Sequence, residues 1–259
     1  MCKLLKISRS NYYTYHQRKI VEDPLTQDIV RIFHDNKKVY GTRRIKAVLQ
    51  NQGNRVSRRR IGRIMRHEGL VSVYTIAQYK VATSGSNESQ VANVLNREFN
   101  ERERLEAIIS DLTYIRVGHK WNYVCTIMDL HNREIIGYSV GANKNAQLVY
   151  RAFSSIRVNL SLISLFHSDR GKEFINQEIE RLLSTFNIKR SLSHKGNPYD
   201  NAVAESNFKS LKFEFVYQHK FDNLEQLQRE LRGHIWWYNN VRLHSSLGYK
   251  TPVEYSSAL

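Results

Sequence analysis

Three acidic residues occupy positions where a carboxylate could do chemistry. Asp111 lies inside the apolar run DLTYI, Asp169 lies in HSDRG, and Glu205 lies near the start of a predicted helix. An acidic residue in an apolar strand pattern is rare unless it has a partner or an ion. Crowded carboxylates need a cation, and their hard oxygens suit magnesium or manganese, two of which about 3.5 to 4 Å apart can drive displacement at a phosphodiester. We therefore interpret the three residues as a candidate metal-dependent nuclease or strand-transfer site.

Each carboxylate also has a structural interpretation. Asp169 precedes an Arg-Gly pair and fits a turn, while Glu205 fits a glutamate that the helix dipole favours in a first turn. Asp129 and Asp200 are rival ligands that rank behind the three, because Asp200 precedes a helix like a cap and Asp129 ends a strand. Lone histidines are expected to complete local hydrogen-bond networks rather than bind metal. No residue is assigned to an organic cofactor.

The elements that must position these residues follow from periodicity and turn signals. Strands are predicted at 107–117, 122–130, 134–141, 161–167 and 188–192, and helices at 144–157, 173–186, 201–217 and 224–238. This order predicts an α/β domain with a mixed five-stranded sheet flanked by helices. The first and fourth strands can then be central neighbours, with the helix that begins near residue 201 crossing their ends. Trp236, Trp237 and Tyr238 of the last helix are expected to lie in the core, with stacking on nucleic-acid bases as the alternative.

The helix that carries Glu205 has two different faces. Glu205, Lys209 and Lys212 recur at spacings of four and three, so they share one face with Asn201. The opposite face is apolar and consists of Ala204, Phe208, Leu211 and Phe215. Burial of that stripe would direct the lysines toward DNA phosphates, although an ordinary Glu–Lys helix pair would have the same spacing.

The positive charge of the chain is concentrated near its N-terminus. Residues 1–80 contain 18 lysines and arginines against 5 acidic residues, while the whole 259-residue chain carries a net charge of +16. Three short helices are expected there, the last one after Ser57, which can cap it. They predict a helix-turn-helix that binds nucleic acid, whereas a generic basic surface is the alternative. The candidate DNA-binding residues are Arg43, Arg44, Arg58, Arg59, Arg60 and Arg63.

Composition divides the chain into three parts. A basic DNA-binding region at 1–82 precedes a polar linker at 83–100, and the catalytic core with its C-terminal helices occupies 101–259. No apolar stretch approaches the roughly 18 residues of a membrane span, and the two cysteines form no CxxC pair. We expect a cytoplasmic protein without a membrane partner.

Longer motifs resemble one known family. The 35 residues that separate Asp169 from Glu205 resemble the Asp-Asp-35-Glu signature of retroviral-integrase-like transposases. The segments SLSHKGNPYDNAVAESNFKSLK, MDLHNREIIGYSV, YNNVRLHSSLGYKTPVEY and YGTRRIKAVL are similar to OrfB-type transposases of the insertion-sequence-three family. The resemblance implies a ribonuclease H-like core and a DNA transposase that uses magnesium, with Asp111, Asp169 and Glu205 as metal ligands and Lys212 as a DNA contact.

The same resemblance implies partners. These are double-stranded DNA, as element ends and as target, a homo-oligomer assembled on that DNA, and a product of an upstream frame as fusion or partner, with the DNA-bound form associated with the nucleoid. Two alternatives stay open at this point: a non-catalytic helix-turn-helix DNA-binding protein, and a ribonuclease H-like nuclease that cuts without joining.

Overall fold

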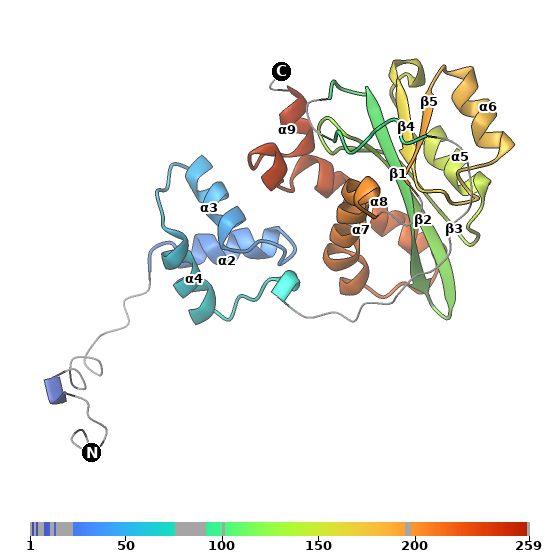
Figure 1. Ribbon diagram of the computed structural model, residues 1–259. Coiled ribbons are helices and arrows are strands. Elements are labelled where there is room, and N and C mark those ends of the chain that lie inside the picture. The colour runs from blue at the N-terminus through green and yellow to red at the C-terminus, as the bar shows by residue number, and fades with distance from the viewer. Residues whose placement is uncertain are drawn as a thin grey trace. The chain divides into compact units, whose positions relative to one another are not determined.

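The computed structural model describes residues 23–75, 92–99, 102–194 and 198–257, together with residues 2, 4, 8–10 and 13. These residues form two compact units, Met1–Val71 and Ser72–Leu259, which are treated separately below. Figure 1 shows the helices of the first unit and the sheet of the second. Within the described residues, no helix combines the length and the apolar character needed to span a membrane.

The described residues of the first unit include the three predicted helices, α2 (Thr26–Asp35), α3 (Thr42–Asn51) and α4 (Arg58–His67). The Ser57 side chain accepts a hydrogen bond from the backbone N–H of Arg60 and so caps α4, which confirms the predicted start. Gly69, just beyond α4, has a φ of +65°, a conformation that glycine adopts without strain. The core of the unit is apolar and is formed by Ile29, Ile32, Phe33, Ile45, Leu49, Ile61 and Ile64.

The second unit is built on a mixed five-stranded sheet, which confirms the predicted fold class. Its strands are β1 (Ala107–Val117), β2 (Lys120–Asp129), β3 (Ile135–Gly141), β4 (Leu165–Ser168) and β5 (Lys189–Leu192). The spatial order is β3-β2-β1-β4-β5. The first three strands pair antiparallel, whereas β4 is parallel to both β1 and β5. The first and fourth strands are therefore neighbours, as expected.

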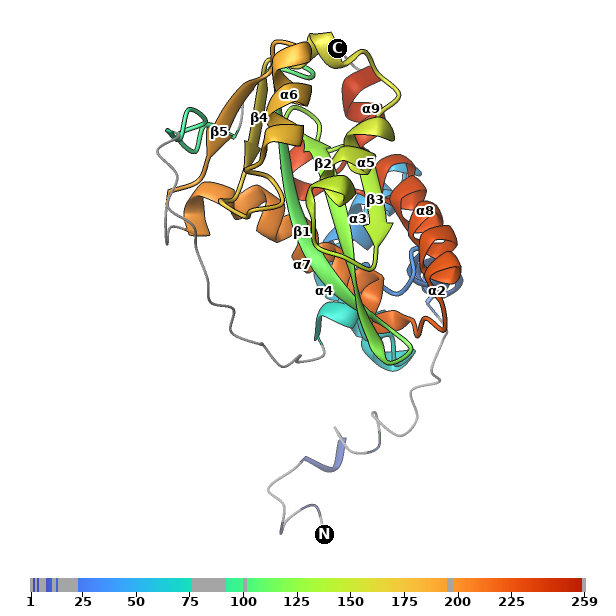
Figure 2. The ribbon, with the colours of Figure 1, turned by 90° about the vertical axis from the view of Figure 1, so that its right-hand side faces the viewer.

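Helices cover both faces of this sheet (Figures 1 and 2). On one face, α5 (Ala146–Ser154) and α6 (Gln177–Thr185) pack over a core that includes Ile108, Phe153 and Phe166. On the other face lie α7 (Ala202–Glu214) and α8 (Leu224–Asn240). An amide hydrogen bond of 3.2 Å from Asn207 of α7 to the Thr126 hydroxyl of β2 joins helix to sheet.

Several boundaries differ from the predictions because side-chain caps intervene. The strand predicted at 161–167 begins only at Leu165, since Asn159 caps a 3-10 turn at Leu160–Leu162. Asn176 accepts from the backbone N–H of Ile179 and starts α6 later than expected. A short terminal helix, α9 (Pro252–Ser257), was not predicted. The other 3-10 turns are Val73–Thr75, Pro198–Asn201, Val216–Gln218 and Ser245–Leu247.

The segment predicted as a linker is only partly described, because residues 83–91 and 100 lie outside the described residues. Residues 92–99 pack against the second unit: Leu95 is fully buried, and the backbone N–H groups of Val94 and Leu95 donate to the Ser191 hydroxyl of β5. This part is anchored by burial and hydrogen bonds that its polar composition does not reveal.

Candidate active site

Asp111 occupies the middle of β1 and is partly buried on the sheet face opposite α5 and α6. Its Oδ1 accepts a hydrogen bond of 2.7 Å from the backbone N–H of Leu112. Burial is the main cause that raises the pKa of Asp111 to about 7, and the negative charges of Asp169 and Glu205 act in the same direction. The surroundings of Asp111 therefore disfavour the ionised form of its carboxyl group.

Asp169 directly follows β4, the parallel neighbour of β1. Its Oδ1 accepts from the backbone N–H of Gly171 at 2.9 Å, which closes the turn expected for HSDRG. Burial raises the pKa of Asp169, and the charge of Glu173 adds to this effect. The charge of Asp169 in turn disfavours the ionised form of Asp111 on the neighbouring strand.

Two residues beside this pair were missed by sequence reasoning. Lys144 Nζ lies 2.9 Å from Glu173 Oε1, and Glu173 is only 6% exposed. Burial opposes the charge of Lys144, but the hydrogen bond to Glu173 and the charge of Glu173, followed by the charges of Asp169 and Asp111, outweigh it and raise the pKa of Lys144. A Cβ added at Gly171 would lie 2.2 Å from Glu173 Oε1, so glycine leaves the room that Glu173 occupies. Lys144 and Glu173 each lie at the start of a predicted helix. The sequence at these two positions does not indicate that they form an ion pair beside the aspartates.

Glu205 lies on the first turn of α7 and is exposed, as predicted for a residue on its polar face. The apolar face predicted for this helix is confirmed: Ala204, Phe208, Leu211 and Phe215 are all buried. Lys209 is exposed, whereas burial lowers the pKa of the half-buried Lys212. Lys212 also feels the charge of Asp111, so this helix face and β1 are electrostatically connected.

The described residues contain no group of three or more His, Cys, Asp or Glu side chains positioned to hold a metal ion. The charges of Asp169 and Glu205 both act on Asp111, but the three side chains are not arranged around one common ion position. Their joint role as metal ligands consequently remains a prediction.

The rival acidic residues have structural partners. Asp129 is fully buried and accepts from the backbone N–H groups of Leu105 and His131, so it closes the turn after β2. Asp200 is buried too; although burial opposes ionisation, hydrogen bonds from Arg97 and His194 hold its pKa well below the usual range. Asp200 therefore connects distant segments rather than serving only as a helix cap.

His167 lies in a buried hydrogen-bond network rather than in a metal site. The ring of His167 contacts the Ser191 hydroxyl and the Asp200 carbonyl, and burial lowers its pKa to about 4, so it is neutral near pH 7.

Trp237 and Tyr238 are buried as predicted, but the prediction for Trp236 was wrong, since it is 62% exposed. Consecutive helix positions point about 100° apart, and three in a row cannot all face one core.

The predicted DNA-binding arginines of the first unit differ in their surroundings. Arg43, Arg58, Arg59 and Arg63 are exposed, and the Arg44 guanidinium lies 5.5 Å from the centre of the Tyr40 ring. Arg60 instead forms a two-pronged ion pair with Asp23, at 2.7 and 2.8 Å, which ties α4 to the segment before α2. Its DNA-binding role is still a prediction, but its guanidinium is already engaged.

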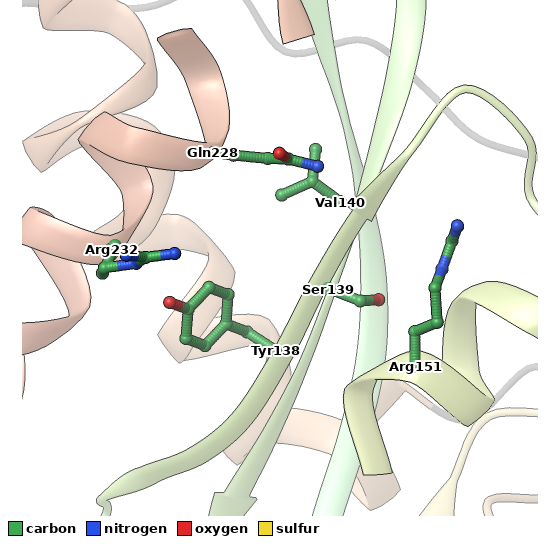
Figure 3. A pocket seen from close by; sticks show the side chains of 6 residues that line it. All are labelled: Tyr138, Ser139, Val140, Arg151, Gln228 and Arg232. Carbon is green, nitrogen blue, oxygen red and sulfur yellow. The ribbon is translucent and has the colours of Figure 1, made fainter. Parts of the chain in front are cut away.

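A pocket between β3, α5 and α8 lies apart from these carboxylates. It is lined by Tyr138, Ser139, Val140, Arg151, Gln228 and Arg232, whose side chains are drawn in Figure 3. None of the predicted metal ligands lines it.

The chain matches known families of protein domains. Residues 21–76 match the HTH-like domain family, and residues 101–198 and 186–252 match two integrase core domain families. The simian T-cell lymphotropic virus intasome contains a chain of the same fold, with a TM-score of 0.50 at 13% identity, covering 87% of this chain and 73% of that one. The second unit is thus an integrase core.

Relatives then define the family. A 31 kDa protein of insertion element IS600 from Shigella sonnei is 31% identical over 98% of this chain and 97% of its own length. Transposase InsF of insertion sequence IS3A from Escherichia coli K12 is 27% identical over 99% of this chain and 93% of its own length. The chain belongs to the insertion-sequence transposases that combine an HTH-like domain with an integrase core, and it is a DNA transposase.

Proposed function

We propose that Asp111, Asp169 and Glu205 hold divalent cations, magnesium or manganese and two in number, for DNA cleavage and strand transfer at the ends of an insertion element. The observation that carries this proposal is the repulsion that the charge of Asp169, just after the neighbouring strand, exerts on the ionised form of Asp111. Burial and that repulsion raise the pKa of Asp111 to about 7. Because ionised carboxylates are unfavourable in this environment, a bound cation would stabilise them.

The donor set fits such ions in part. Carboxylate oxygens on β1 and after β4 are the ligands that hard cations prefer. Glu205 supports the set because its charge already acts on Asp111. It is exposed on the first turn of α7, so it would need to approach the two aspartates to share an ion with them.

When bound, the cations would supply activation of the attacking oxygen and stabilisation of the leaving oxygen at the scissile phosphate. The chain's own residues would orient the DNA. Lys209 and Lys212 lie on the same face of α7 as Glu205 and would hold phosphates near the carboxylates. Lys144, paired with Glu173 at 2.9 Å, would offset part of the negative charge of the aspartates.

Recognition of the element ends would fall to the first unit. The exposed arginines of α3 and α4 would contact phosphates and base edges of double-stranded DNA. We further propose that the chain works as a homo-oligomer on DNA, that an upstream-frame product takes part as fusion or partner, and that the protein acts in the cytoplasm on nucleoid DNA.

The test is a strand-transfer assay with labelled element-end DNA and Mg²⁺. Asp111→Asn, Asp169→Asn and Glu205→Gln are each expected to lose both cleavage and joining while retaining DNA binding. Glu225→Gln is the matched control, because Glu225 is exposed in the first turn of α8 as Glu205 is in α7. Activity that survives in any of the three variants removes that residue from the site.

The same assay separates the alternatives. Joined products support transposition, cut products without joining indicate a hydrolytic nuclease, and DNA retention without cutting indicates a binding protein. The last two outcomes contradict the proposed mechanism.

A further inference from the structure

The β1–β2 hairpin extends well beyond the central part of the sheet. β4 pairs with β1 only at Ala107–Ile109, while β1 continues to Val117 and β2 starts at Lys120. The far end of the hairpin therefore has no β4 or β5 beside it (Figure 2). Ile115 and Val117 at this end are buried, but Arg116, Lys120 and Trp121 are exposed and are available for a role other than forming the core.

Aromatic and basic residues gather at this end. Trp121 is 55% exposed, and its ring meets the Tyr114 ring edge-on with centroids 5.1 Å apart. Lys212 of α7 places its Nζ 4.9 Å from the centre of the Tyr114 ring, within cation–π range. Arg116, directly opposite Trp121 in the register, and Lys120 are both exposed. We call these five residues the hairpin surface: Tyr114, Arg116, Lys120, Trp121 and Lys212.

The charge of the hairpin surface is one-sided. Residues 114–121 read YIRVGHKW and include no acidic residue. Asp222 contributes one negative charge next to the hairpin tip, where the preceding residue, Phe221, accepts from the backbone N–H of Gly118. An exposed tryptophan among cations is the combination that binds nucleic acid strands, since the cations attract phosphates and the indole stacks on a base.

We propose that the hairpin surface binds an unpaired base of the DNA strand that reaches the carboxylates, with Trp121 as the stacking platform. This inference rests on the proposed function for the presence of DNA at Asp111. Tyr114 is three residues from Asp111 along β1, about 10 Å at the rise of an extended strand, and this odd spacing places the two side chains on opposite faces of the sheet. Because β4 pairs with β1 only at Ala107–Ile109, β4 does not cover the edge of β1 between them, and the DNA strand would pass around this edge. Lys212 connects the two places, because it contacts the Tyr114 ring and feels the charge of Asp111.

DNA is favoured over a second protein chain as the occupant. A protein interface would gain from apolar neighbours around the tryptophan, whereas Trp121 is accompanied by Arg116, Lys120 and Lys212. Lys212 also belongs both to the hairpin surface and to the α7 face on which the lysines would hold phosphates.

The test measures DNA affinity by fluorescence anisotropy of the full chain in EDTA, so that no strand is cut. The probes are a duplex with a short unpaired thymidine tail and the same duplex fully paired. Trp121→Ala is expected to weaken binding of the tailed duplex by roughly 5- to 100-fold and to affect the paired duplex much less. Trp121→Phe should restore most of the affinity, because a phenyl ring still stacks.

Trp236→Ala is the matched control, since Trp236 is an exposed tryptophan on α8. If Trp121→Ala binds the tailed duplex as Trp236→Ala does, or weakens both probes equally, the proposal is overturned. A second measurement uses 5-iodouracil in the tail of the probe and the unaltered chain. Photocrosslinks should map to the peptide that contains Trp121, and crosslinks confined to other peptides also overturn the proposal.

Failure of this inference is distinguishable from failure of the proposed function. If the chain joins element ends but Trp121→Ala binds normally, only the hairpin surface is wrong. If Trp121→Ala loses affinity for the tailed duplex while no cutting or joining occurs with Mg²⁺, the hairpin surface stands and the proposed catalysis fails.

Discussion

Replacing Asp111 by asparagine should stabilise the metal-free protein above neutral pH. In the native chain the carboxylate is buried beside the charge of Asp169, which raises its pKa from 3.8 to about 7. The folded state therefore binds a proton more tightly than the unfolded state does. Its contribution to stability is present below about pH 4 and is lost as the pH rises through about 7. Asparagine has a similar shape and no charge, so it escapes this loss.

The size of the effect follows from the two pKa values. Each tenfold change in proton affinity is worth about 1.4 kcal/mol, so a rise from 3.8 to about 7 corresponds to roughly 4 kcal/mol. Because the side chain is partly exposed, solvent screening reduces this, and we expect Asp111→Asn to be more stable by about 2 to 4 kcal/mol at about pH 8. For a unit of this size the melting temperature would rise by roughly 5 to 15 °C.

The assay is urea unfolding in EDTA, followed across the range from about pH 4 to about pH 8. Asp222→Asn serves as the control, because Asp222 is exposed and its replacement should change stability little. The reasoning is refuted if Asp111→Asn is no more stable than the native chain at the upper pH. A stability difference that fails to shrink toward the lower pH would refute it equally, since the pKa would then not be its source.

Three further perturbations address other parts of the chain. Arg242 is 4% exposed and forms a two-pronged ion pair, 2.7 Å at each contact, with the fully buried Glu214. Arg242→Leu should therefore destabilise the second unit by about 3 to 5 kcal/mol in urea unfolding. A Cβ at Gly137 would lie 2.6 Å from a backbone carbonyl of α5, so Gly137→Ala should cost about 1 to 3 kcal/mol in the same measurement. In the first unit, Arg58→Ala should lower the slope of log affinity against log salt by up to about 0.9, whereas Arg60→Ala should change it less because its guanidinium is already ion-paired.

Controls for these predictions come from the same elements. Arg229→Leu changes an exposed arginine of α8 and should cost less than about 0.5 kcal/mol, so an equal cost for Arg242→Leu would contradict the buried-pair argument. Replacing both Arg242 and Glu214 by leucine should cost less than the two single changes together. For Gly137, a variant as stable as the native chain would mean that β3 and α5 separate easily. For the first unit, equal slopes for Arg58→Ala and Arg60→Ala would mean that DNA displaces Asp23.

Local patterns determined a large part of this protein. Richness in Ile, Val, Tyr and Thr, bounded by a turn at Gly118, predicted β1 with its observed bounds, and Asp111 stood out as an acidic residue in that apolar strand. The Ser57 cap predicted the start of α4, and the 3.6-residue period predicted which face of α7 is buried. Such features depend on residues a few positions apart, which interact in the same way whatever the rest of the chain does.

Tertiary structure decided where side chains from distant segments meet. Arg97 and His194 both donate hydrogen bonds to the buried Asp200, and Lys144 forms an ion pair with Glu173 beside the aspartates. Likewise, the Tyr74 hydroxyl donates to Glu214, a partner on α7 that its own segment does not suggest. The burial of a charge and the sign of its pKa shift depend on groups far away in sequence, because desolvation and Coulomb forces act through space. A linear pattern could therefore nominate the carboxylates, but their electrostatic environment arose only when the strands and helices packed together.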